Sequence, residues 1–268
     1  MMRKLFCILL FLFLCTQSQA GVQWSGAVLG AEKLQPISKG ITFDNTDDYI
    51  DLGTTSTYST ALTGAFSISA WARPHDGTAG SIFSKAGASG SRGVNLYYED
   101  DITDYWEFHL APTSTTLVFA SGDFVPTLNT WYHLAVVYVP STSLTLYING
   151  VAYTNTTSIP ASSYMPSLEP RIGMRSDNIQ QFDGDITECA LWNTNLTMTQ
   201  VQSLYTNIKG KPLRVQTANL LDYWALDDVP VGESADGDTF VSQGSGANSG
   251  TGVDGANNTG LTSVAVSI

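Results

Sequence analysis

Three carboxylates follow one another closely in the stretch FDGDITECALWN, residues 182–193. They are Asp183, Asp185 and Glu188. Two carboxyl groups about 5–5.5 Å apart can hydrolyse a glycosidic bond with retention, one as nucleophile and the other as acid and base. The sequence offers no histidine or polar cluster beside this motif that would tune such an acid. We therefore predict that the protein is not an enzyme and keep glycoside hydrolysis as an alternative.

A second group of carboxylates lies in the stretch ITFDNTDDYIDLG, residues 41–53. Asp44, Asp47 and Asp48 occur within five positions of one another. Carboxylate oxygens are ligands that Ca2+ prefers, so these residues form a candidate calcium site. Aspartates also cap backbone amides in turns. That structural role for Asp44 and Asp47 is the alternative interpretation.

Aromatic residues flank an acidic loop farther along the chain. Successive side chains of a strand point to opposite faces, so either Tyr97 or Tyr98 must point outward. An exposed ring can stack on a sugar while nearby carboxylates accept its hydroxyl groups. We predict a ligand-binding platform that comprises Tyr98, Trp106, Asp100 and Asp101. Burial of the two rings in the core is the alternative.

Other catalytic patterns are missing from the sequence. The three histidines, His75, His109 and His133, are scattered and lack metal-ligand spacing. The motifs of serine hydrolases and phosphate-binding loops do not occur. Cys189 would be the sole cysteine left after removal of a signal peptide, and we expect it to be a small buried residue.

The segments that would position these residues follow the pattern of a β-sandwich. Short apolar or alternating runs are separated by clusters of Gly, Pro, Ser, Thr and Asn. Leu144, Leu146 and Ile148 alternate with polar neighbours, and Asn149-Gly150 then favours a two-residue hairpin turn. One helix is expected after the last of these strands, because Thr197 and Gln200 fit a capping box. The sequence therefore predicts an all-β, two-sheet antiparallel jelly roll with one short helix.

The bulk composition suggests an exported protein. Arg3 and Lys4 precede an apolar run over residues 5–14, which is too short to cross a bilayer, and Ser18-Gln19-Ala20 fits a cleavage site. The full chain has a formal charge of −12, and loss of two basic and no acidic residues with the signal leaves −14. Such a surface repels nucleic acid and anionic membranes.

The chain divides into four parts in this interpretation. We predict a signal peptide over 1–20, a short lead over 21–40, the jelly roll over 41–232 and a C-terminal tail over 233–268. The tail is rich in Gly, Ser and Asn, so we expect residues 243–260 to be flexible and the end of the chain to pack back as a weak strand.

Five segments in this order resemble laminin-G-like and pentraxin-like modules of the concanavalin A type. They are ITFDNTDDYIDLG (41–53), FSISAWARP (66–74), WYHLAVVYVPSTSLTLYING (131–150), residues 182–206 and LLDYWAL (220–226). The resemblance implies a jelly roll that binds ligands, often sugars and often with calcium, on its concave face or rim loops. Glucanases of the same fold carry E-x-D-x-x-E on one strand, where this chain has Asp183 in place of the first Glu.

The resemblance also implies two calcium positions. Pentraxin-like modules hold calcium with an Asp-Asn pair and a later acidic loop, but Arg92-Gly93 replaces the pair and Arg175 replaces a glutamate. A cation there would repel the ion, so we do not expect that site. In laminin-G-like modules a closing-strand aspartate binds calcium, which adds Asp185 to the candidate ligands. Thr187 stands where a carboxylate is usual, so we expect calcium to have little effect on stability.

Together these observations predict a secreted, non-catalytic recognition module that binds a glycan or an extracellular protein. A structural or adhesion subunit that assembles with copies of itself is the second alternative, because the acidic surface and signal peptide fit it equally well. Calcium is the one cofactor that the residues suggest.

Overall fold

The computed structural model describes residues 36–53, 56–100, 105–206, 209–255 and 260–268. The predicted signal peptide, most of the lead and Asp101 lie outside these residues. Residues 34–268 form one compact unit. None of the described helices is long and apolar enough to cross a membrane.

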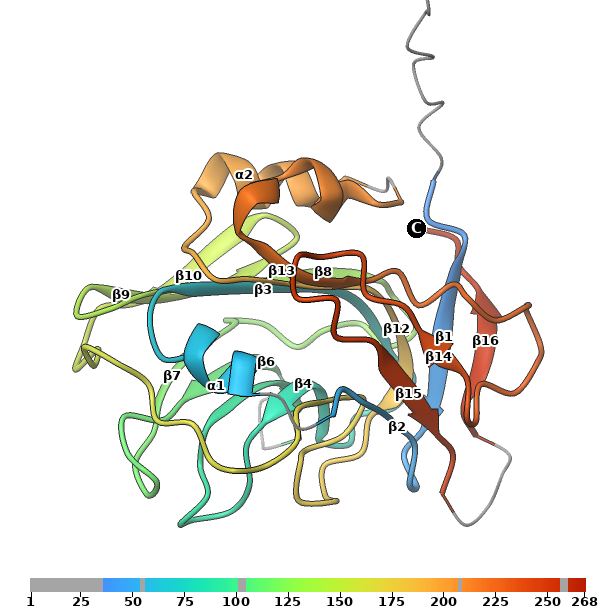
Figure 1. Cartoon of the computed structure of the whole chain (residues 1–268), viewed down its shortest axis with the longest axis horizontal. Coiled ribbons are helices and arrows are strands. Elements are labelled where there is room, and N and C mark those ends of the chain that lie inside the picture. The colour runs from blue at the N-terminus through green and yellow to red at the C-terminus, as the bar shows by residue number, and fades with distance from the viewer. Residues whose placement is uncertain (1–35, 54–55, 101–104, 207–208, 256–259) are drawn as a thin grey trace, which may run out of the picture. The chain divides into compact units, whose positions relative to one another are not determined.

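Two antiparallel sheets of eight strands each form the described chain, as the sequence predicts (Figure 1). Sheet A has the order β10-β9-β8-β3-β12-β1-β16, and β13 pairs with β12. Its strands are β1 (Lys39–Asp44), β3 (Phe66–Pro74), β8 (Tyr132–Val139), β9 (Ser143–Ile148), β10 (Val151–Asn155), β12 (Asp183–Trp192), β13 (Leu220–Trp224) and β16 (Thr262–Ala265).

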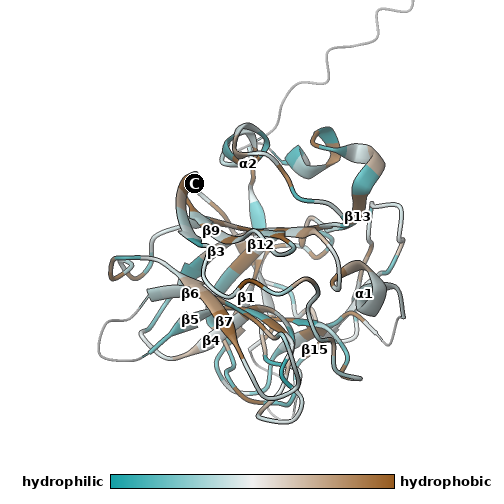
Figure 2. Cartoon of the chain, turned by 90° about the vertical axis from the view of Figure 1, so that its left-hand side faces the viewer, coloured by the Kyte–Doolittle hydropathy of each residue, from teal (hydrophilic) through white to brown (hydrophobic). Residues whose placement is uncertain are grey.

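Sheet B has the order β14-β15-β2-β11-β4-β5-β6-β7. Its strands are β2 (Tyr49–Asp51), β4 (Gly80–Lys85), β5 (Val94–Glu99), β6 (Tyr105–Leu110), β7 (Val118–Ser121), β11 (Arg171–Ile172), β14 (Thr239–Phe240) and β15 (Gly250–Val253). The strand segments predicted from alternation and turn residues coincide with most of these elements. Figure 2 shows the hydrophobic stretches that run along the strands of both layers.

The core lies between the sheets, where each contributes the inward half of its alternating side chains. Sheet A is also covered on its other face by α2 (Met198–Leu204), whose Val201 and Leu204 pack on Ala135 and Trp192. The capping box predicted for this helix is present, since the Thr197 hydroxyl accepts from the Gln200 amide.

Several local elements were not predicted. A second helix, α1 (Ser56–Ala61), follows β2 and buries Tyr58. Two 3-10 turns, η1 (Lys211–Arg214) and η2 (Thr217–Asn219), connect α2 to β13. The expected hairpin at Asn149-Gly150 is confirmed, and both residues have positive φ, as a tight two-residue turn requires.

The C-terminal segment belongs to both sheets. Strand β15 pairs with β2 in sheet B, and β16 pairs with β1 in sheet A. The prediction of a flexible loop over 243–260 is therefore wrong for residues 250–253, which form β15. Gly and Ser lower strand propensity, but the ladder partner supplied by β2 outweighs that preference.

Candidate functional site

Tyr98 and Trp106 lie in the core and not on the surface. They face each other across β5 and β6, with ring centroids 5.3 Å apart, and are 1% and 0% exposed. A sugar cannot stack on rings that have no accessible face, so the prediction of a platform on these residues is wrong. Asp100 is exposed at the end of β5, and Asp101 lies outside the described residues.

The neighbouring positions of β5 and β6 carry polar groups on the side of sheet B away from the core, where Tyr97 and Glu107 are buried and Glu99 and His109 are half-buried. The Tyr97 hydroxyl lies 2.6 Å from carboxylate oxygens of both Glu99 and Glu107. The His109 Nε2 atom lies 3.0 Å from that hydroxyl and 2.8 Å from Glu107. We call these four residues the Tyr97 network. Burial and the hydrogen bond to Glu107 raise the pKa of Tyr97 above its ordinary value, so the hydroxyl stays protonated.

An exposed phenyl ring adjoins this network. Phe119 on β7 is the ladder partner of His109, and the ring centroids are 6.2 Å apart. Its residue is 52% exposed, because β7 is the last strand of sheet B. A sheet edge therefore combines an accessible aromatic face with hydrogen-bonding groups on the adjacent strands.

A groove of about 360 Å³ opens beside Phe119, between the edge strands β7 and β10 of the two sheets. Ligand pockets in proteins are typically of this size or larger. We call it the Phe119 groove, and its lining residues are Phe119, Ala120, Ser121, Tyr153, Thr154 and Asn155. Two aromatic rings and several hydroxyl and amide groups thus border one open space.

The loop that follows β11 covers another part of the same face. Arg175 donates to both carboxylate oxygens of Asp177, at 2.7 and 3.0 Å, and to Gln180 at 3.0 Å. Gln180 also accepts from Asn95. The Arg175 guanidinium lowers the pKa of Asp177 despite its partial burial. Arg175, which replaces a glutamate of the pentraxin-type calcium site, is thus paired with a carboxylate and an amide of its own loop.

The carboxylates of the motif over 183–188 have separate partners. Asp185 is fully buried and accepts from Thr42 at 2.6 Å and from Arg73 at 2.5 Å. His75 lies 2.8 Å from Asp185 and 3.5 Å from Asp183. The expectation that no histidine lies beside this motif is thus wrong, because β12 and the end of β3 are adjacent in sheet A.

Glu188 faces the helical cover of sheet A. It sits at a β-bulge with φ of 53° and accepts from the Tyr223 hydroxyl at 2.9 Å and the Gly210 amide at 3.0 Å. Burial raises its pKa to about 7, although those two hydrogen bonds favour the charged form. The cavity beside it measures about 10 Å³, room for one water and far too small for a saccharide.

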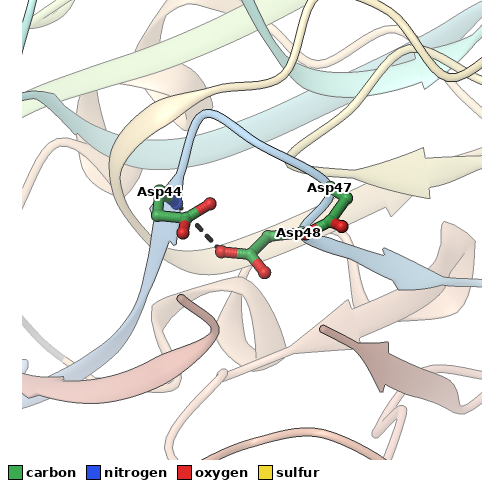
Figure 3. Close-up of side chains that lie close together, drawn as sticks. All are labelled: Asp44, Asp47 and Asp48. Atoms are coloured by element: carbon green, nitrogen blue, oxygen red, sulfur yellow. Dashed lines mark hydrogen bonds between the residues drawn. The ribbon is translucent and has the colours of Figure 1, made fainter. Parts of the chain in front are cut away.

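The three aspartates between β1 and β2 form a cluster, as the sequence predicts, and we call it the acidic cluster. Asp44, Asp47 and Asp48 have carboxylate oxygens within 4.8 Å of one another, at the corner where β1 passes into β2 (Figure 3). Asp44 also caps the Thr46 amide, which confirms its predicted turn role. Asp185 is not part of this cluster, because its oxygens are held by Thr42, Arg73 and His75.

Burial and like charge act together on the centre of the cluster. Asp48 is 1% exposed, and burial raises its pKa to about 7. The charges of Asp44 and Asp254 raise it further, while a hydrogen bond from the Asp44 amide opposes the shift. Asp254 was not among the predicted site residues, since nothing in its local sequence links it to residues 44–48.

Phe119, His109 and Glu107 were also missed. For Glu107 and His109 the signal was strand alternation, which places them on the face of β6 opposite to that of Trp106 and on the same face as Tyr97. Phe119 carries no such signal, because its exposure follows from the edge position of β7 in the sheet.

The two antiparallel sheets form a jelly-roll sandwich. The family model for the concanavalin A-like lectin/glucanases superfamily matches residues 44–202, more than half of the chain. The chain therefore belongs to this superfamily, of which laminin-G-like domains form a part. No curated protein sequence matches it significantly.

Solved structures share the fold at low identity. A candidate carbohydrate-binding protein from Bacteroides ovatus is 18% identical with a TM-score of 0.60, over 87% of this chain and 61% of that one. A pentraxin from Limulus polyphemus is 17% identical, with a TM-score of 0.50 over 65% and 84%. The CBM40 of a Ruminococcus gnavus sialidase, bound to sialyllactose, is 12% identical, with a TM-score of 0.50 over 64% and 100%.

Proposed function

We propose that this protein is a secreted, non-catalytic carbohydrate-binding module and that the Phe119 groove, with the adjoining half-buried His109, is its binding surface. The observation that carries the proposal is the exposed Phe119 ring at the border of an open groove and beside His109. Sugars are bound by such pairings, in which an aromatic face covers the apolar side of the ring and polar groups meet its hydroxyls.

The superfamily and the structural neighbours support a glycan ligand. A carbohydrate-binding module bound to sialyllactose and a candidate carbohydrate-binding protein share this fold. The predicted signal peptide supports secretion, and the acidic composition argues against nucleic acid as a partner. The non-catalytic role is supported by Glu188, which is buried beneath α2 and η1 with no room for a substrate.

The test compares glycan binding by two exposed-aromatic variants. The purified protein is screened on a glycan array, and its best ligand is then titrated against Phe119→Ala and Phe124→Ala. We expect Phe119→Ala to weaken binding by tenfold or more, since truncating an aromatic residue at the centre of a binding surface costs about 2 kcal/mol or more. Phe124 is a matched control, because it is an exposed aromatic that does not line the groove.

Two results would contradict the proposal. Equal binding by both variants would remove the Phe119 groove as the site. Release of reducing sugar from any bound glycan by the wild-type protein, lost in Glu188→Gln, would show a hydrolase and end the non-catalytic interpretation.

A further inference from the structure

Two corners of the chain lie against each other at one end of the sandwich. The N-terminal corner joins β1 to β2, and what we call the C-terminal corner comprises residues 254–255 after β15 and residues 260–261 before β16. Since β16 pairs with β1 and β15 pairs with β2, both parts of the C-terminal corner lie beside the N-terminal corner. Figure 1 shows these four strands together, and Figure 3 shows the ends of the C-terminal strands beside the acidic cluster.

The C-terminal corner brings a fourth carboxylate to the cluster. Asp254 directly follows β15 and is 4% exposed. Its Oδ2 atom accepts from the Gly260 and Leu261 amides, at 3.2 and 3.4 Å. Its charge acts on Asp48, which places the two carboxylates in one electrostatic environment.

Asp48 and Asp254 each have one carboxylate oxygen without a hydrogen-bond partner among the described residues. In both residues this oxygen is Oδ1, and it is buried. Of the salt bridges in the described part of the chain, none involves Asp44, Asp48 or Asp254. Buried polar atoms are nearly always paired, and a buried charge without a partner is costly. A small cation placed between the two corners would pair both oxygens at once.

Glycines allow the C-terminal corner to approach the carboxylates. A Cβ atom on Gly260 would overlap the carboxylates of Asp44 and Asp48, and one on Gly255 would overlap that of Asp47. The backbone of one corner thus touches the acidic groups of the other. Carbonyl oxygens at such a contact are further ligands of the kind that calcium accepts.

We propose that Asp254 joins Asp44 and Asp48 in binding a divalent cation of the calcium type, and that this ion fastens the C-terminal strands to the N-terminal strand. Asp47 lies in the same cluster and adds negative charge. A donor set made only of oxygens selects hard cations such as Ca2+ over transition metals. The inference extends the candidate calcium site to a residue beyond the family match at 44–202. It also replaces the expectation that calcium has little effect on stability, because Asp254 supplies a carboxylate that Thr187 does not. It does not depend on glycan binding.

The test measures calcium binding and thermal unfolding of the purified protein. Wild type, Asp254→Asn and Asp238→Asn are each melted in chelator, in calcium and in magnesium, and calcium binding is followed by calorimetry. Asp238 is the control, because it is an exposed aspartate of the same segment. With free calcium at about 100 times its Kd, we expect the Tm of the wild type and of the control to rise by about 5–10 °C.

Asp254→Asn should behave differently in the two conditions. The amide keeps the shape of the carboxylate but removes one negative charge, so in chelator the variant should melt at or above the wild-type Tm. In calcium it should show about half of the wild-type increase or less and a Kd at least tenfold weaker. These two signs together separate a cation ligand from a purely structural aspartate.

Other outcomes overturn the proposal. A wild-type protein with no heat of calcium binding and no calcium-dependent Tm has no such site, whether or not the variants fold. An Asp254→Asn variant that loses the same number of degrees in chelator and in calcium has lost only its hydrogen bonds to Gly260 and Leu261. Unchanged calcium affinity in that variant would place the ion elsewhere.

Discussion

Neighbouring tyrosines on β5 have opposite environments. Tyr98 packs on Trp106 between the sheets, while the Tyr97 hydroxyl meets Glu107 and His109 on the outer face. A shift of one position along the strand therefore separates a ring of the central core from a hydroxyl that bonds polar groups on the other side of the sheet. Phe119, one strand farther along, is accessible because no strand follows β7 in sheet B.

Among these residues, the buried Trp106 ring should contribute most to the free energy of unfolding. Trp106→Ala should lower the free energy of unfolding by about 3–5 kcal/mol, because a large cavity opens in a core that cannot collapse. Phe119→Ala should change it by at most about 0.5 kcal/mol, as is usual for exposed positions. Urea unfolding of both variants checks this. If Trp106→Ala weakened glycan binding and left stability intact, the ring would be a ligand contact after all.

At the scale of elements, β12 and the helices above it form a second packed layer. The bulge at Glu188 turns that carboxylate toward the cover, where Tyr223 and the Gly210 amide satisfy it. The apolar sides of α2 and β13 pack around it and leave a cavity with room for about one water. A carboxylate held in this way has no open surface on which to meet a saccharide.

Its titration gives a pH-dependent contribution to stability. The folded pKa of Glu188 is about 7, above its ordinary value of 4.5, so the folded state holds more protons than the unfolded state between these values. Stability contributed by this group should therefore fall as the pH rises from about 4.5 to about 7 and level off above that, by about 3 kcal/mol in total.

Glu188→Gln removes that dependence, because the amide does not titrate. The unfolding free energies of the variant and the wild type are measured from pH 4.5 to 8. The variant should become more stable relative to the wild type as the pH rises. The exposed Glu233→Gln is the control and should give a flat difference. A flat difference for Glu188→Gln as well would mean that its pKa is not raised.

For the whole molecule, the C-terminal segment is a structural part of the sandwich. Its strands extend sheet B beside β2 and sheet A beside β1, and Leu261 and Phe240 are fully buried in the central core. The proposed cation would join the two ends of the described chain at the corner where they meet. The tail over 233–268 thus completes both sheets.

A core leucine tests this role. Leu261→Ala should destabilise the protein by about 2–5 kcal/mol, because the side chain is fully buried in the main core. Val241→Ala, at an exposed position of the same segment, should cost at most about 0.5 kcal/mol. Thermal or urea unfolding measures both. Equal, small effects would show that the segment does not stabilise the sandwich.

The sequence by itself determined the strands, the turns and the class of fold. Alternation over 143–148, the Asn149-Gly150 turn and the Thr197 capping box are short-range patterns, and each was found where it was predicted. Three aspartates within five positions were also certain to be neighbours. Such features depend on backbone geometry between residues that are close in the chain.

Tertiary structure decided which faces and which distant groups meet. Alternation shows that Tyr97 and Tyr98 differ but not which one faces the core, because that depends on the sheet packed opposite. The exposure of Phe119 follows from strand order, and Asp254 meets Asp48 only because β15 and β16 pair with β2 and β1. The physical reason is that ladder pairing and burial join residues far apart in the sequence, and no local pattern carries that information.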